Sequence, residues 1–318
     1  MTVLGLTVLI QIILNVICSY KPSIELPTWS VNALPNSTEL ESNDIQRDRV
    51  VMSMTAVPSE IPEALNKTIN NLLYEQSFVV DCIYLNIPYI QLRNKNALYP
   101  STEELRVMFP QNGVIIHRIL ADAGPTTRYL GAIELESHPE TLVITMDMDP
   151  WNFHNFTIQQ LVEYAHFDRN SVWTVWGENM VWNPLTGYWA VDYWRYPLVI
   201  DDTFQKSWNT VEILRAVNGV AFRRKWFDDL WFNATDYHIG CFWTDDHWFS
   251  FNMERQGIGI KLIHDYEQSV KEREEKNQRR LGTLTQVNNE LNSDSQCTIN
   301  IMKRHRDIWV NVRDEHAE

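Results

Sequence analysis

Two aspartates stand where an apolar stretch of the sequence ends. The segment "TLVITMDMDPW", residues 141–151, places Asp147 and Asp149 two residues apart. In extended backbone alternate side chains point to the same side, so both carboxylates would face one ligand. Such a pair suits Mg²⁺ or Mn²⁺, and the cation would neutralise a diphosphate. The alternative is that the aspartates solvate a strand end and cap the next turn, as Asp commonly does.

A second acidic pair, Asp245 and Asp246, occurs in "CFWTDDHWFSFNMERQGI". These residues are predicted to open a helix that Gly257 closes. Acidic residues at a helix start ordinarily cap the backbone and complement the helix dipole. A carboxylate there could also be a general base that takes a proton from an acceptor hydroxyl. Neither pair is decisive alone.

The elements that would position these residues alternate between strands and helices. Apolar runs predict strands at residues 49–56, 78–88, 113–119 and 142–146. Helices are predicted at 59–73, 101–109 and 124–135, with a Ser101–Glu104 capping box opening the second. This order predicts an α/β fold with a mostly parallel central sheet flanked by helices. Ligands bind outside the carboxyl ends of such strands, which is where Asp147 and Asp149 lie.

Beyond Asp149 the pattern becomes irregular and rich in aromatic residues. The chain has 318 residues and 44% hydrophobic content, which suits one large domain with tails. A net charge of −14 and a pI near 5.1 argue against a nucleic-acid polymer as partner, because a phosphate backbone binds clustered Lys and Arg. A small phosphate ligand with a metal stays open.

The two ends of the chain are predicted to lie outside the folded domain, which spans residues 48–265. Residues 2–18 form an apolar stretch typical of a targeting segment, so residues 1–20 are read as a signal peptide or a short membrane anchor. Residues 21–47 mix Pro, Ser and Asn and suit a stem or linker. Residues 266–318 form a charged tail, expected to be helical and solvated.

Sequons and cysteines bear on the compartment. Four N-x-S/T sequons fit a glycoprotein of the secretory pathway. They lie at Asn36, Asn66, Asn155 and Asn233. Cys18 falls inside the leader, which leaves Cys82, Cys241 and Cys297, an odd number whose pairing stays open.

Several segments together resemble a known family, the nucleotide-sugar glycosyltransferases of the GT-A fold, of the family 2-like kind. They cover about residues 48–265 in the family's order. The matching segments are "VVMSMTAVPSEI", "IYLNIPY", "DAGPTTRYLGAIE", "ETLVITMDMD", "VNGVAFRRKWFDD" and "FWTDDHWFSFNMERQGIGI". The chain departs from close relatives, which often carry three consecutive acidic residues, by having Met148 between the two aspartates.

The resemblance implies roles for individual residues. Asp147 and Asp149 would hold the metal, with Asp147 nearer the ribose, and Asp245 or Asp246 would supply the base. The remaining residues implied to bind the nucleotide sugar are Thr55, Pro58, Asp122, Gly124, Arg128 and Gly219.

The resemblance implies a Mn²⁺- or Mg²⁺-dependent transfer of a sugar from a nucleotide-sugar donor to a hydroxyl of a glycan, lipid or protein, with inversion. The expected compartment is the ER or Golgi lumen, with the chain anchored through residues 2–18 or secreted. Tryptophans could form an acceptor platform or pack in the core. Candidates lie between Trp173 and Trp194. The alternatives are a glycoside hydrolase with paired carboxylates and a non-catalytic carbohydrate-binding pseudoenzyme.

Overall fold

The computed structural model describes a defined part of the chain. The described residues are 48–91, 97–120, 122–147, 155–183, 188–191, 210–227, 231, 241–242, 244–263 and 293–304. The predicted leader and stem, and the residues Asn36, Asn233 and Asp149, lie outside them. Within these ranges no helix has the length and apolar character needed to cross a membrane.

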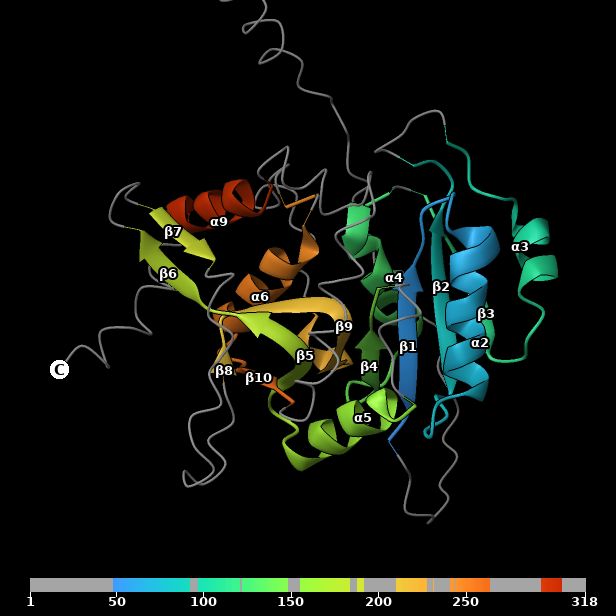
Figure 1. The fold of residues 1–318 in the computed structure, drawn as a ribbon, viewed down its shortest axis with the longest axis horizontal. Helices are drawn as coiled ribbons and strands as arrows, with labels where there is room; N and C mark the ends of the chain where they lie inside the picture. The colour runs from blue at the N-terminus through green and yellow to red at the C-terminus, as the bar shows by residue number, and fades with distance from the viewer. Residues whose placement is uncertain are drawn as a thin grey trace, which may run out of the picture. The chain divides into compact units, whose positions relative to one another are not determined.

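The first half of the domain alternates strands and helices, as predicted (Figure 1). It consists of β1 (Val50–Thr55), η1 (Ile61–Leu65), α2 (Asn66–Tyr74), β2 (Cys82–Pro88), α3 (Thr102–Met108), β3 (Val114–Ile119), η2 (Gly124–Thr126), α4 (Thr127–Leu135) and β4 (Leu142–Thr145). The predicted capping box opens α3: Glu104 N donates to Ser101 Oγ at 3.1 Å, and Ser101 N donates to Glu104 Oε2 at 2.7 Å.

The second half also contains regular elements, although its sequence pattern beyond Asp149 is irregular. Its elements are α5 (Thr157–Phe167), β5 (Val172–Glu178), β6 (Met180–Asn183), β7 (Tyr188–Val191), β8 (Thr210–Val211), β9 (Ile213–Arg223), η4 (Arg224–Trp226), α6 (Asp245–Arg255), β10 (Ile260–Leu262) and α9 (Ser293–Arg304). Strand β5 is buried along nearly its whole length, and its register with β9 shifts between Thr174 and Trp176. Both features remove the alternation by which a strand is recognised.

The central sheet has eight strands in the order β3-β2-β1-β4-β9-β5-β10-β8. Strands β3, β2, β1 and β4 run parallel, and β10 runs parallel to β5. Strand β9 lies antiparallel to β4 and β5, and β8 lies antiparallel to β10. The predicted α/β class, with a mostly parallel central sheet flanked by helices, is confirmed.

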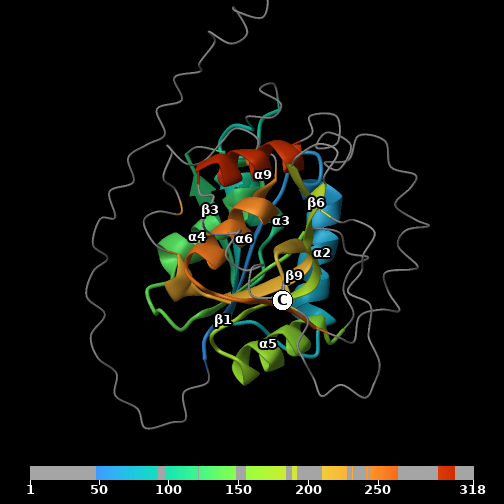
Figure 2. The same ribbon diagram turned by 90° about the vertical axis from the view of Figure 1, so that its left-hand side faces the viewer.

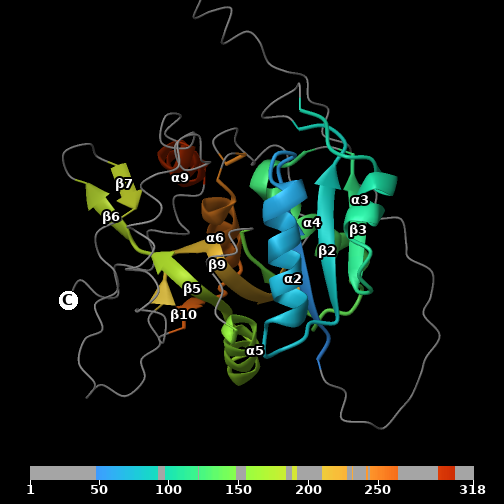
Figure 3. The ribbon, with the colours of Figure 1, turned by 45° about the vertical axis from the view of Figure 1, so that its right-hand side comes forward.

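Helices cover both faces of the sheet. Alternate residues of β1 point to opposite faces: Val50 and Met52 pack with residues of α2 and α5, whereas Val51 packs with residues of α4 and α6. Figure 3 shows α2 in front of β1 and β2, with α4 behind them. The β1 side chains from Val50 to Met54 are fully buried, so each face of the sheet contributes a hydrophobic layer.

Gly219 in β9 adopts a conformation that other residues rarely take, with φ +117°. A Cβ added there would lie 2.8 Å from Leu161 Cδ1 of α5. We expect Gly219→Ala to lower the free energy of unfolding by about 2 kcal/mol, from strain and overpacking together. Urea unfolding measures it. The matched control is Gly113→Ala, where φ is +93° but no atom lies within 4 Å of the added Cβ. An equal loss in both variants would contradict the packing contribution.

Candidate functional site

The carboxyl ends of β1 to β4 lie at one edge of the sheet, because these strands run parallel. Thr55 ends β1 and donates its hydroxyl hydrogen to Asn86 O at 2.7 Å, which joins the ends of β1 and β2. Pro58 lies half-buried in the turn after β1. Asp122 follows β3, and Asp147 follows β4. The structure therefore brings these four predicted residues to the edge where ligands bind in α/β sheets.

A tight turn between β3 and α4 sets the start of α4. Asp122 Oδ1 accepts hydrogen bonds from Gly124 N at 2.8 Å and from the Thr127 hydroxyl at 3.4 Å. Gly124 has φ +65°, a left-handed conformation that favours glycine. Asp122 and Gly124 thus organise the turn that directs Arg128, in the first turn of α4, into the site.

Arg128 joins the two acidic pairs that the sequence keeps far apart. Its Nη1 lies 2.7 Å from Asp147 Oδ1, and its Nε lies 3.0 Å from Asp245 Oδ2. A further bond from Nη2 reaches Asp245 Oδ1 at 3.3 Å, across 117 residues of sequence. The arginine side chain is only 7% exposed, so the pairing is well shielded from solvent. One buried guanidinium therefore holds the end of β4 against the start of α6.

The charges around Arg128 differ in their access to solvent. The Asp245 side chain is buried, and this burial raises its pKa although Arg128 opposes the rise. Burial would lower the pKa of Arg128, but Asp245 and Asp147 hold it above its ordinary value. Asp147 is 40% exposed. The carboxylate of Asp245 is thus held against the arginine away from solvent, while that of Asp147 is accessible to solvent.

Asp246 is the other half of the second acidic pair and contacts β9 instead. Its Oδ1 accepts a hydrogen bond from Ala216 N at 3.1 Å, and its Oδ2 lies 3.5 Å from Arg215 Nη1. Burial and the neighbouring Asp245 carboxylate raise the pKa of Asp246 to about 7. The side chain is 18% exposed. A pKa near the working pH is the property that general base catalysis favours.

Arg215 is a residue of this site that the sequence did not reveal. It lies in β9 and pairs with Glu178 at 2.7 Å as well as with Asp246. Arg215 lies within the apolar run "ILRAVNGVAF". This position indicated a buried ion pair, because a charged residue in a buried strand almost always has a partner of opposite charge. The identity of the partners could not follow from that pattern.

Only one of the two predicted metal ligands, Asp147, is among the described residues. Asp147 supplies one carboxylate of the kind that Mg²⁺ and Mn²⁺ bind, and it is accessible. Asp149, the second predicted ligand, is not among the described residues. Within the described ranges no group of three His, Cys, Asp or Glu side chains could hold a metal ion. The cation at Asp147 and Asp149 stays a prediction.

The candidate tryptophans differ in burial: Trp176 in β5 is half-buried, whereas Trp173 is not exposed at all. Trp173 in β5 is fully buried and donates its Nε1 hydrogen to Asp168 O at 3.2 Å, so it belongs to the core. Trp182 and Trp189 pair across the β6–β7 hairpin. Trp194 lies outside the described residues. An acceptor platform is a prediction that can involve only the tryptophans other than Trp173.

The raised pKa of Asp246 predicts a cost to stability. The folded chain favours the protonated carboxyl, so the destabilisation grows as the pH rises from the ordinary value of 3.8 through about 7. Asp246→Asn mimics the protonated form, and we expect it to raise the free energy of unfolding at pH 8 by about 1–2 kcal/mol, with less gain at pH 5. Urea unfolding at both pH values tests this.

Asp168→Asn is the matched control for that prediction. Burial alone would raise the pKa of Asp168, but Lys261 at 2.6 Å and Ser171 hold it below its ordinary value. The same substitution is therefore expected to destabilise the protein above pH 4, opposite in sign to Asp246→Asn. A loss of stability in Asp246→Asn at pH 8 would contradict the burial of that carboxylate.

Comparisons with known proteins give a limited result. No protein-family model matches the chain, and no curated protein matches it by sequence. Among solved structures, a 4-diphosphocytidyl-2C-methyl-D-erythritol synthase from Anaerococcus prevotii is similar with a TM-score of 0.40 and 14% identity, over 68% of this chain and 88% of that chain. A UTP-bound UGPase from Acinetobacter baumannii is similar with a TM-score of 0.36 and 9% identity, over 69% of this chain and 87% of that one. Likenesses of this size do not identify a family or an activity for this chain.

Proposed function

We propose that the chain is a metal-dependent glycosyltransferase of the GT-A type that moves a sugar from a nucleotide-sugar donor to a hydroxyl acceptor. The observation that carries this proposal is the pairing of Arg128 with both Asp147, at the carboxyl end of β4, and Asp245, at the start of α6. This pairing brings together two features. One is the sheet edge where α/β proteins bind ligands, and the other is an acidic helix start that could take a proton from an acceptor hydroxyl.

The donor side of the proposed site consists of Asp147, Asp149 and Arg128. The planar guanidinium of Arg128 matches the geometry of a phosphate, and its Nη1 contacts the partly exposed Asp147 at 2.7 Å. A divalent cation held by Asp147 and Asp149 would stabilise the negative charge that develops on the departing nucleoside diphosphate. Thr55, Pro58 and the Asp122–Gly124 turn lie at the same edge and would shape the rest of the nucleotide pocket.

On the acceptor side we assign the base to Asp246. Both oxygens of Asp245 contact Arg128, so Asp245 is better placed to hold the arginine than to accept a proton. Asp246 is more exposed, and its pKa of about 7 suits proton transfer near neutral pH. The acceptor hydroxyl gives its proton to Asp246, its oxygen bonds to the anomeric carbon, and the bond from that carbon to the phosphate oxygen breaks. A single displacement of this kind inverts the anomeric configuration.

The compartment is a proposal that rests on several separate features. The apolar stretch at residues 2–18 and the sequons suit entry into the secretory pathway. Cys241 and Cys297 form a disulfide, and structural disulfides persist in oxidising compartments. These features support the ER or Golgi lumen, or secretion, and acceptors found there: glycans, lipids or proteins.

The two alternatives fit the geometry less well. A glycoside hydrolase needs two carboxylates that flank a sugar bond. Here the guanidinium of Arg128 lies between Asp147 and Asp245 and contacts both. No specific observation favours a non-catalytic carbohydrate-binding protein, whereas a carboxylate with a pKa of about 7 is common at sites of proton transfer.

The test is a thermal-shift screen of the full chain against UDP-sugars and GDP-sugars, with and without Mn²⁺. A ligand at one hundred times its dissociation constant stabilises the folded state by about 2.7 kcal/mol. We expect one nucleotide class to raise the melting temperature in the presence of Mn²⁺, and Asp147→Asn to remove this shift. Glu103→Gln, on the exposed face of α3, should retain it.

Turnover distinguishes the classes of protein. With the nucleotide sugar that binds, we expect release of nucleoside diphosphate in the presence of a hydroxyl acceptor. Hydrolysis of a synthetic glycoside with no use of any nucleotide sugar would overturn the proposal in favour of a hydrolase. Acceptor binding with no turnover of either substrate would favour the pseudoenzyme.

A further inference from the structure

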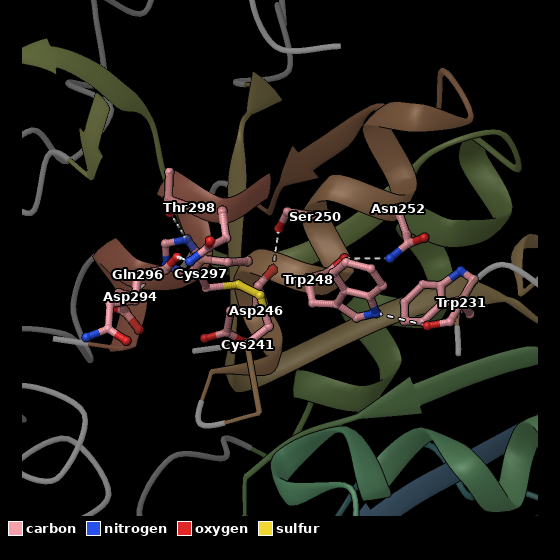
Figure 4. The surroundings of a disulfide bond; sticks show 12 residues. Trp231, Cys241, Asp246, Trp248, Ser250, Asn252, Asp294, Gln296, Cys297 and Thr298 are labelled. Carbon is pink, nitrogen blue, oxygen red and sulfur yellow. Dashed lines mark hydrogen bonds and ion pairs between the residues drawn. A yellow bond between two sulfur atoms is a disulfide. The ribbon is translucent and has the colours of Figure 1, made fainter. Parts of the chain in front are cut away.

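The first turn of α6 is tied to a helix much further along the chain. Figure 2 shows α9 lying over α6. A disulfide links Cys297 of α9 to Cys241, just before α6, across 56 residues of sequence, and both cysteines are fully buried (Figure 4). Helix α9 lies within the predicted tail, yet Ile301 is also buried, so this part of the tail is packed on the domain and is not a solvated helix.

Arg215 connects α9 to the acidic pair of α6. Its Nη1 and Nη2 each lie 3.2 Å from Asp294 Oδ2 of α9. The same guanidinium pairs with Glu178 at 2.7 Å and with Asp246 at 3.5 Å. Three carboxylates from β5, α6 and α9 therefore share one arginine, and Asp294 competes with Asp246 for it.

A second set of contacts joins α9 to α6 beside Asp246. His247 is fully buried, and its Nδ1 lies 2.7 Å from the Thr298 hydroxyl of α9. Its Nε2 lies 3.6 Å from Asp294 Oδ2. Burial alone would raise the pKa of Asp294, but His247, Arg215 and Thr244 hold it well below its ordinary value. Asp294 is thus ionised at neutral pH and faces the start of α6.

We infer that α9 is a positioning element of the acidic site: the Cys241–Cys297 disulfide seats Asp294 against Arg215, and Arg215, shared with Asp246, fixes where the Asp246 carboxylate points. The inference rests on the proposed function only in taking Asp246 as the base. The coupling of Asp294 to Asp246 through Arg215 is a physical property of the folded chain and can be measured without any turnover.

The direction of the coupling follows from the charges around Asp246. Among the described residues, those that act on it electrostatically are Asp245 of α6, Arg215 of β9, Arg128 of α4 and Asp147 after β4. Glu178 of β5 and Asp294 of α9 share Arg215 with it, and His247 of α6 contacts Asp294. Removing the charge of Asp294 removes a repulsive neighbour and leaves Arg215 freer to pair with Asp246. Both changes favour the ionised carboxylate, so the pKa of Asp246 should fall.

The experiment follows the titration of Asp246 in the full chain by NMR of carbonyl-labelled aspartate, with Asp246→Asn used to assign the resonance. We expect Asp294→Asn to lower the pKa of Asp246 by about 0.5–1 unit. The double variant Cys241→Ser, Cys297→Ser should lower the pKa of Asp246 by a smaller amount, because the disulfide no longer holds Asp294 against Arg215. Lys303→Gln, on the exposed side of the same helix, should leave it unchanged. Asp294→Glu should restore much of the wild-type value, since it keeps the charge.

The outcomes separate this inference from the proposed function. An unchanged Asp246 titration in Asp294→Asn would overturn the inference. If that variant fails to fold, Arg215→Lys replaces it: the compact ammonium cannot hold three carboxylates, so the pKa of Asp246 should rise, and no rise would overturn the inference. Where turnover occurs, the acid limb of the rate profile should move with the titration, while KM for the donor stays constant. If the Asp246 titration shifts but the wild type shows no turnover, the proposed function is contradicted and the inference about α9 is retained.

Discussion

Replacing Arg128 with methionine is expected to lower the free energy of unfolding by about 3–5 kcal/mol and to abolish binding of the nucleotide sugar. The stability falls because Asp245 stays buried without the cation that compensates it. Binding is lost because Asp147 is no longer held and the diphosphate loses its guanidinium partner. Urea unfolding and the thermal-shift screen measure the two effects.

The double variant Arg128→Met, Asp245→Asn separates charge from packing. Removing both partners of a buried ion pair costs less than removing one, so we expect the double variant to regain more than half of the stability lost by Arg128→Met. Arg106→Met, on the exposed side of α3, should change stability by less than about 0.5 kcal/mol. A double variant as unstable as Arg128→Met would show that packing, rather than charge, explains the loss.

Asp246→Asn is expected to reduce kcat by about 10²–10⁴-fold while leaving KM for the donor nearly unchanged. The base must be deprotonated to act, so kcat/KM should fall as the pH drops below the pKa of about 7. Steady-state kinetics between pH 5 and pH 9 would test both statements.

Asp245→Asn is the matched variant on the neighbouring position. Because Asp245 holds Arg128, we expect this change to raise KM for the donor more than it lowers kcat. The reverse pattern, with full kcat in Asp246→Asn and a collapsed kcat in Asp245→Asn, would assign the base to Asp245. Retention of the anomeric configuration would count against either assignment.

The elements that local patterns specify were predictable from the sequence. Strands β1, β2 and β4 are largely apolar runs, and the Ser101–Glu104 capping box is a short-range signature that α3 bears out. The helix that begins at Asp245 and is closed by Gly257, where φ is +68°, was also predictable from its acidic first turn and its closing glycine. The position of Asp147 at the carboxyl-end edge of the sheet was also predictable, because it depends only on strand order.

Long-range pairing was not predictable, because nothing local encodes it. Arg128 meets Asp245 across 117 residues, and Arg215 meets Asp294 across 79. The same holds for the disulfide, since three cysteines in the body of the chain allow several pairings and leave one thiol over, here Cys82. Strand β5 was missed for another reason: its nearly continuous burial, which includes Trp173, and a shift in its register with β9 hide the period of two.

The most direct test of the central claim, that Asp147 and Arg128 belong to a donor site, is a crystal structure of the protein with Mn²⁺ and the nucleoside diphosphate that stabilises it. We expect the diphosphate to lie against Arg128 at the carboxyl end of β4, with the cation between it and the carboxylates of Asp147 and Asp149. A nucleotide bound elsewhere, with the Asp147 and Asp149 side chains pointing apart, would contradict the claim.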